Sequence, residues 1–177
     1  MTENNYVIRA ELTEQFKDSL TDPWNPETII AGTQLSRLAG LGRLRLAVIR
    51  VPPGGEATGY HARLTEEEWY YVLSGKGVIE IGPHENFLAP GDFVGFPPGS
   101  PPRQLRNPFR EPLVCLVGGE QREVDVTDFP RIGKRLFRHS GVVEIYDTAD
   151  AEEIRPTDMD EVVATSLRRS MKKPDRP

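Results

Sequence analysis

Cysteine is almost absent from this sequence, which has one, Cys115, in 177 residues. A lone cysteine forms no disulfide within the chain, and this one lies in the apolar run at residues 113–117, so we expect a small buried hydrophobic residue and not a nucleophile. No apolar run is long enough to span a membrane, and the first residues lack the charged and apolar regions of a signal peptide. We therefore expect a cytoplasmic protein with no membrane partner.

Basic residues are outnumbered, since 22 Lys and Arg against 27 Asp and Glu give a net charge of −5. No basic face with interleaved aromatic residues appears, so a nucleic-acid partner is not expected. Hydrophobic residues make up 37% of the sequence, enough for a soluble domain with a buried core. The length fits one domain with appended ends, and no internal repeat is visible.

Glycine and proline, in contrast, are abundant, with sixteen of each. They separate short apolar stretches at regular spacing, a pattern typical of a β-barrel or β-sandwich. The first such stretch has Leu44, Leu46 and Val48 on one face. We expect strands at residues 43–51, 58–63, 68–73, 76–81, 86–89, 92–96, 104–106 and 113–117, and a turn at 82–86.

Two parts of this glycine-rich region resemble the paired motifs of the cupin superfamily. The first motif, a glycine followed by a His-any-His pair, a glutamate and a second glycine, fits Gly55, His61, Glu68 and Gly75. Arg63 stands where the second histidine of the pair belongs. The resemblance implies an all-β fold, the cupin double-stranded β-helix or jelly-roll barrel.

The second motif fits through its Gly-Pro-Gly skeleton, which ends at Gly99. Its histidine position falls on Pro102 when counted from the glycine, or on Arg103 when counted back from Asn107, because this chain has one extra residue. Neither residue is a histidine, so the glycine and proline framework matches while the ligand set departs from the motif.

Around the barrel we divide the sequence into four segments. Residues 1–42 are expected to form an irregular N-terminal arm, and residues 43–118 the barrel core. Residues 119–150 are polar and are expected to wrap the outside, with an edge strand at 142–146. Residues 151–177 predict a short C-terminal helix, capped by Thr157, and a disordered tail. The resemblance implies a homodimer, and we expect the arm or the helix to lie in its interface.

Typical metal-binding cupins hold a divalent transition metal with three histidines and one glutamate. Here His61 and Glu68 are the metal ligands that remain, and such a metal normally takes at least three protein ligands. His84 lies in the expected turn and His139 lies far outside the motifs, so we expect neither to help. The sequence predicts no tightly bound cofactor. The alternative is a divalent metal held by His61, Glu68 and further ligands.

Strand alternation places Glu66, Glu68 and Tyr70 on one face. If Glu68 faces the barrel interior, Tyr70 adds a phenol there, whereas Glu66 is interpreted as the solvated end of a hairpin.

Arginine at the histidine positions predicts an anion site. Guanidinium groups bind carboxylate or phosphate bidentately, so Arg63 and Arg103, with Gln104 as a polar neighbour, are candidate ligand-binding residues. The alternative is that Arg63 pairs with Glu68 and plugs the barrel. Two arginines against one glutamate leave a positive excess, which favours the ligand site.

The leading hypothesis is therefore a small-molecule-binding cupin for an anionic metabolite, with enzymatic activity left open. His61 would transfer protons, because the reference pKa of a histidine side chain lies near neutrality. Glu68 would orient it, and Tyr70 would offer a hydrogen bond. The alternatives are a metal-dependent oxygenase or isomerase, and a non-catalytic cupin with an assembly or regulatory role.

Overall fold

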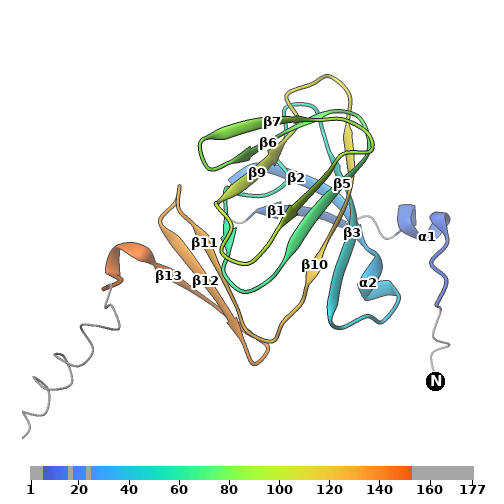
Figure 1. Ribbon diagram of the computed structural model, residues 1–177. Coiled ribbons are helices and arrows are strands. Elements are labelled where there is room, and N and C mark those ends of the chain that lie inside the picture. The colour runs from blue at the N-terminus through green and yellow to red at the C-terminus, as the bar shows by residue number, and fades with distance from the viewer. Residues whose placement is uncertain (1–5, 16–17, 23–24, 153–177) are drawn as a thin grey trace, which may run out of the picture. The chain divides into compact units, whose positions relative to one another are not determined.

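The structure is a computed structural model that describes residues 6–15, 18–22 and 25–152 (Figure 1). The described residues up to Asp147 form one compact unit. The described residues 148–152 belong to a second unit and include a short 3-10 helix at Thr148–Asp150. The predicted C-terminal helix lies outside the described residues. None of the helices described here has the length and apolar character needed to cross a bilayer.

The largest sheet has six antiparallel strands in the order β1-β2-β3-β10-β5-β8. Its central pair is β3 and β10, whose register runs from Leu113 opposite Val51 to Glu120 opposite Leu44. The strands are β1 (Asp18–Asp22), β2 (Asn25–Gln34), β3 (Leu44–Val51), β10 (Leu113–Glu120), β5 (Glu68–Ser74) and β8 (Phe93–Phe96).

The N-terminal region is not the irregular arm that the sequence predicted. β1 and β2 form a hairpin, and β2 pairs with β3, so this region adds two strands to the barrel sheet. The short helices α1 (Ala10–Gln15) and α2 (Leu35–Leu38) flank the hairpin. The prolines around it favour loops locally, and pairing with β3 is what makes β2 a strand.

A three-stranded sheet in the order β7-β6-β9 faces the large one. It contains β6 (Gly77–Ile81), β7 (His84–Leu88) and β9 (Arg103–Arg106). The predicted turn shortens to Gly82 and Pro83, so His84 begins a strand and is exposed.

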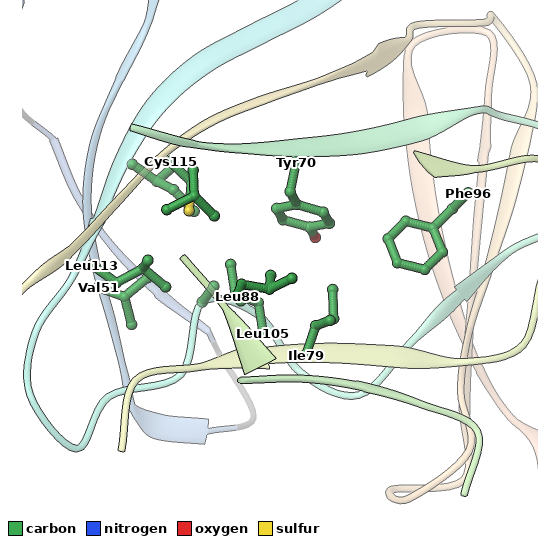
Figure 2. Packing of buried hydrophobic residues seen from close by; sticks show 11 residues of the cluster. Val51, Tyr70, Ile79, Leu88, Phe96, Leu105, Leu113 and Cys115 are labelled. Atoms are coloured by element: carbon green, nitrogen blue, oxygen red, sulfur yellow. The ribbon is translucent and has the colours of Figure 1, made fainter. Parts of the chain in front are cut away.

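The hydrophobic core lies between these two sheets (Figure 2). Val51, Leu113 and Cys115 enter it from the large sheet, and Ile79 and Leu105 from the small one. Cys115 is fully buried, as expected, and burial raises the pKa of its thiol to about 12. The core face of β3 is the one that holds Val51, so the apolar face with Leu44 points outward, and Leu44 is 57% exposed.

A third sheet, in the order β13-β12-β11-β4, replaces the wrapping segment expected after Gly119. The edge strand is confirmed as β13 (Val142–Asp147), but β11 (Asp125–Phe129) and β12 (Lys134–His139) are strands as well. β11 pairs with β4 (Ala62–Arg63), which brings the third sheet next to the first cupin motif.

Gly75, at the end of β5, allows the close approach of β5 to the start of β10. Its φ is +77°, and a Cβ there would lie 2.2 Å from the carbonyl oxygen of Pro112. The motif glycine Gly99 has nearly the same φ, +73°, but a Cβ there would meet nothing within 4 Å. Substitutions at the two glycines therefore distinguish the cost of the left-handed backbone from the cost of a steric clash.

We predict that Gly75→Ala destabilises the protein much more than Gly99→Ala. The Gly99 variant should lose about 1–2 kcal/mol, from the left-handed backbone alone. The Gly75 variant should lose about 3 kcal/mol or more, because the clash adds to that strain. Urea unfolding of both variants measures the difference. Equal losses would show that the contact with Pro112 is not tight.

Candidate functional site

The motif residues converge inside the barrel on the carboxylate of Glu68. Glu68 begins β5, Arg63 ends β4, His61 directly precedes β4 and Arg103 begins β9. His61 and Arg103 lie opposite each other and exchange two backbone hydrogen bonds, of 3.0 and 2.8 Å. The motif spacing thus brings together side chains that are up to 42 positions apart in the sequence.

Arg103, and not Pro102, takes the histidine position of the second motif. Its Nη2 and Nε donate to Glu68 Oε2 at 2.6 and 3.1 Å. Its guanidinium carbon lies 4.7 Å from the ring centroid of Phe96, a cation–π contact. The side chain is 1% exposed, so this cation is held inside the barrel.

Both oxygens of Glu68 are in use. Oε2 also accepts from the Tyr70 hydroxyl at 3.3 Å, and Oε1 accepts from Arg45 Nη2 at 3.1 Å. The predicted alternation is confirmed, because Glu66, Glu68 and Tyr70 are all buried on one face. Burial, and then the charge of Glu68, raise the pKa of the Tyr70 hydroxyl, which stays a neutral donor.

Glu68 is ionised despite its burial. Burial alone would raise its pKa, but the hydrogen bond and charge of His61, followed by the guanidiniums of Arg103 and Arg63, bring the pKa of Glu68 well below its usual range. An ionised carboxylate can only accept hydrogen bonds, so every group that faces it must donate.

His61 faces oxygen acceptors with both ring nitrogens. Nε2 lies 3.3 Å from Glu68 Oε2, and Nδ1 lies 2.8 Å from the carbonyl oxygen of Gly59. The Thr58 hydroxyl is farther from Nδ1, at 3.4 Å. A neutral imidazole carries a proton on one ring nitrogen, so which of these contacts is a donated hydrogen bond depends on the tautomer.

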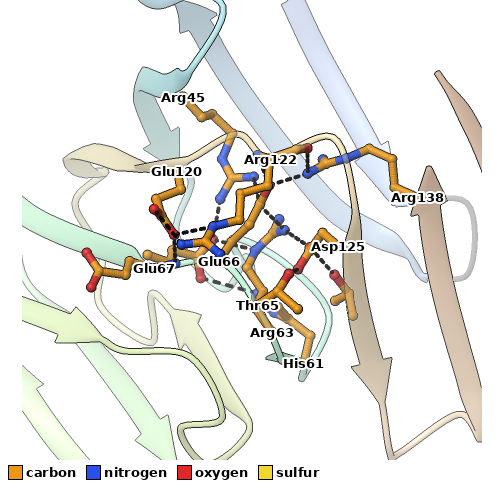
Figure 3. A network of polar contacts seen from close by, with 12 residues as sticks. Arg45, His61, Arg63, Thr65, Glu66, Glu67, Glu120, Arg122, Asp125 and Arg138 are labelled. Atoms are coloured by element: carbon orange, nitrogen blue, oxygen red, sulfur yellow. Dashed lines mark hydrogen bonds and ion pairs between the residues drawn. The ribbon is translucent and has the colours of Figure 1, made fainter. Parts of the chain in front are cut away.

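Glu66 is not the solvated hairpin end that the sequence suggested, because its side chain is fully buried (Figure 3). It accepts from Arg63 Nη1 at 2.8 Å, from the backbone N–H of Arg122 at 2.7 Å and from Arg138 Nη2. Arg122 and Arg138 belong to the region where sequence reasoning missed two strands. Without those strands, the partners of Glu66 could not be foreseen.

Arg63 has a different main partner from the one expected. Its Nη1 donates to Asp125 Oδ2 at 2.6 Å, whereas its Nε stays 3.5 Å from Glu68 without a hydrogen bond. Asp125 is 1% exposed and also accepts from the hydroxyls of Thr65 and Thr127. It comes from β11, 62 positions from Arg63, and no local sequence signal links the two.

The charge balance is therefore not two arginines against one glutamate. We call the whole set the ionic cluster, and its charged side chains are Arg45, Arg63, Arg103, Arg138, Glu66, Glu68 and Asp125. Four guanidiniums against three carboxylates still leave an excess of positive charge. Among the described residues, two buried side-chain nitrogens have no hydrogen-bond partner, Arg63 Nε and Arg103 Nη1.

Gln104 lies apart from the ionic cluster, contrary to its predicted role. Neighbours on a strand point to opposite faces, so Gln104 faces away from the side of β9 that holds Arg103. Its amide nitrogen donates to Glu56 Oε2 at 2.7 Å, and its amide oxygen accepts from Arg131 Nη1 at 2.8 Å. Gln104 thus links Glu56 and Arg131 on the face of β9 that points away from the ionic cluster.

The donor set does not fit a divalent transition metal. Glu68 is occupied by Arg103, and guanidiniums stand where imidazoles would be needed. His84 is exposed, and His139 Nε2 contacts Glu144 at 3.0 Å. Within the part of the chain that the structure describes, no three His, Cys, Asp or Glu side chains are grouped so as to hold a metal.

The fold and this motif geometry agree with the comparisons to known proteins. Residues 47–119 match the cupin domain family. A crystal structure of a candidate sugar phosphate isomerase from Acidithiobacillus ferrooxidans is 35% identical, with a TM-score of 0.80 over 85% of this chain and 97% of that one. The chain belongs to the cupin superfamily. None of the curated proteins matches this cupin significantly.

More distant structures share the fold of this cupin. A sugar phosphate isomerase of the cupin superfamily from Silicibacter pomeroyi is 20% identical, with a TM-score of 0.66 over 71% of this chain and 80% of that one. A predicted oxalate decarboxylase from Thermotoga maritima is 18% identical, with a TM-score of 0.54 over 66% of this chain and 99% of that one. At these identities the likeness concerns the fold alone.

We predict that Arg63→Met destabilises this cupin by about 3–5 kcal/mol, because it leaves buried Asp125 without a cation. Adding Asp125→Asn should recover a large part of the loss. Adding Glu68→Gln instead should recover little, because Glu68 keeps Arg103 and Arg45. Urea unfolding gives the free energies, and stronger rescue by Glu68→Gln would contradict this assignment.

Arg135→Met is the matched control for that series. Arg135 also contacts an aspartate, Asp128, at 2.6 Å, but its side chain is 44% exposed. An exposed ion pair contributes at most about 1 kcal/mol, so this variant should unfold almost like the wild type.

We predict that this cupin, purified without added metal, carries well under one equivalent of Mn, Fe, Ni, Cu or Zn. The variant with both Arg63→His and Arg103→His regains three histidines and Glu68, so it should take up metal when the wild type does not. Elemental analysis after brief chelation measures both proteins. Stoichiometric metal in the wild type would overturn this expectation.

Proposed function

We propose that this cupin binds a small anionic metabolite of the sugar-phosphate class in its barrel, through arginine side chains instead of a metal ion. The observation that carries the proposal is the Arg103 guanidinium, a buried cation whose Nη1 has no partner among the described residues. A buried donor without an acceptor is costly, and a ligand oxygen would satisfy it.

The charge of the ionic cluster favours an anion over a neutral ligand. Guanidiniums exceed carboxylates in it, and a phosphate group can accept two parallel hydrogen bonds from one guanidinium. Exposure also rises outward, from 1% at Arg103 to 15% at Arg63 and 21% at Arg45. The positive charge of the ionic cluster is therefore not confined to fully buried groups, which favours the attraction of an anionic ligand.

The relative from Acidithiobacillus ferrooxidans supports the choice of ligand class, because it is described as a candidate sugar phosphate isomerase and is 35% identical over most of both chains. Isomerisation of a sugar phosphate moves a proton between neighbouring carbon atoms. If the ligand is isomerised here, His61 is the group that carries this proton, and Glu68, 3.3 Å away, holds the ring in place. Tyr70 is a fixed donor beside them.

Binding is tested by calorimetry and thermal shift with a sugar phosphate, the same sugar without phosphate, and inorganic phosphate. We expect the sugar phosphate to bind and to raise the melting temperature, and the neutral sugar to do neither. Arg103→Lys keeps the charge but loses the planar fork, so it should weaken binding at least about tenfold. Arg135→Met is the control and should bind normally.

If no anion binds the folded wild type, we would conclude that the protein's own ion pairs close the barrel to ligands. That outcome would favour the non-catalytic cupin with an assembly or regulatory role.

Catalysis is measured separately, by the exchange of a carbon-bound hydrogen for deuterium when a sugar phosphate is incubated with the protein in D₂O. His61→Asn should abolish that exchange more strongly than it weakens binding.

A further inference from the structure

The turn that joins β11 to β12 lies beside His61. We call this turn, with the last residue of β11, the tip, and it contains residues 129–133. The ring of Phe129, the first residue of the tip, lies 6.0 Å from the ring of His61, measured between centroids. His61 is 4% exposed, and both of its ring nitrogens face groups of the protein itself. The tip therefore takes part in enclosing His61.

Arg131 joins the tip to the small sheet and to the segment before β4. Its Nη1 donates to Gln104 Oε1 at 2.8 Å, and its Nη2 donates to Glu80 Oε1 at 2.5 Å. Its guanidinium carbon lies 4.0 Å from the ring centroid of Tyr60, a cation–π contact. We call these three contacts of Arg131 the latch. Because Tyr60 directly precedes His61, the latch holds the tip next to the residue that Phe129 contacts.

The groups that receive Arg131 are themselves held in place by hydrogen bonds. The amide nitrogen of Gln104 donates to Glu56 at 2.7 Å and to the carbonyl oxygen of Thr58 at 3.1 Å. The Tyr60 hydroxyl donates to the carbonyl oxygen of Gly82 at 3.2 Å. The tip therefore closes on a surface that is already ordered, which lowers the entropic cost of closing.

The base of the same hairpin is attached more firmly than the tip. Arg63 donates to buried Asp125, and the backbone pairing of β11 with β4 extends as far as Asp128 (Figure 3). Residues 130–132 lie beyond this pairing and are exposed. Segments with few buried contacts open at a lower free-energy cost than the rest of a fold. The tip can thus open while the base of the hairpin stays in place.

We infer that the tip is a lid over His61 and that Arg131 holds the lid closed. The inference rests on the proposed function in one respect, namely that the covered site takes a small ligand. An open lid admits the ligand, and a closed lid keeps water away from His61 and Glu68. The Arg131 side chain is 51% exposed, so the contacts of the latch are weak enough to break and form again.

The lid is tested on the ligand-free protein with diethylpyrocarbonate, which modifies unprotonated histidine rings that it can reach. Peptide mass spectrometry gives the rate for each histidine, and exposed His84 is the internal reference. We expect His61 to react much more slowly than His84 in the wild type. Arg131→Met should speed the reaction of His61 at least about tenfold and leave His84 unchanged, because it removes all three contacts of the latch. An unchanged rate at His61, or a wild-type His61 as reactive as His84, would overturn the proposal.

Arg106→Met is the matched control. Arg106 lies two positions after Gln104, on the same face of β9, and its ion pair with Glu85 joins β9 to β7 within the small sheet. This variant should leave the reaction of His61 unchanged, with circular dichroism to check that each variant is folded. Phe129→Ala keeps the latch but removes the ring beside His61, so it should also speed the reaction. Equal acceleration by Arg106→Met and Arg131→Met would show general loosening and would contradict the latch.

A sugar phosphate provides a second measurement. If the lid covers a bound ligand, the sugar phosphate should dissociate at least about tenfold faster from Arg131→Met than from the wild type or from Arg106→Met. The two proposals can fail separately. If no anion binds but the reactivity of His61 still depends on Arg131, the lid stands and the proposed ligand is wrong. If a sugar phosphate binds and leaves both variants at the same rate, the lid over the ligand is wrong and the proposed function stands.

Discussion

The ion pair between Glu68 and Arg103 is the interaction around which the barrel interior is arranged. Neither charge could stay inside a barrel alone, because removing one partner of a buried pair leaves an uncompensated charge. Each therefore requires the other, although they come from β5 and β9 in facing sheets. The pair joins those two sheets. Aliphatic side chains at the same place could also join them, but they would provide no functional group.

The rest of the ionic cluster extends this connection to the third sheet. Arg63 of β4 donates a hydrogen bond to Asp125 of β11, and Glu66 accepts one from Arg138 of β12. The third sheet is thus attached to this side of the barrel through charged groups. Such attachment is directional, so it fixes where each guanidinium points, and it leaves Arg103 Nη1 and Arg63 Nε without partners in the described structure.

The sequence predicted the cupin fold and the convergence of His61 and Glu68, because motif spacing and strand alternation are local properties, but it left Pro102 and Arg103 as alternatives for the histidine position of the second motif. It also predicted most strands up to Val117, where glycine and proline mark the turns. It did not predict the β1–β2 hairpin, β11 or β12. The hairpin joins the sheet by pairing with β3, and β11 pairs with β4, which lies far away in the sequence. For the same reason Glu66 and Asp125 were missed as members of the cluster, and alternation applied to Gln104 would have excluded it from the site.

Arginine in place of histidine changes the source of the positive charge inside the barrel. An imidazole and carboxylate site gains its central charge when it captures a metal ion, so its charge follows the supply of that ion and the acidity around it. A guanidinium remains protonated at any pH a cell experiences. Because guanidiniums outnumber carboxylates in the ionic cluster, this cupin has a permanent positive charge inside its barrel, which exists as soon as the chain has folded and needs no loading step.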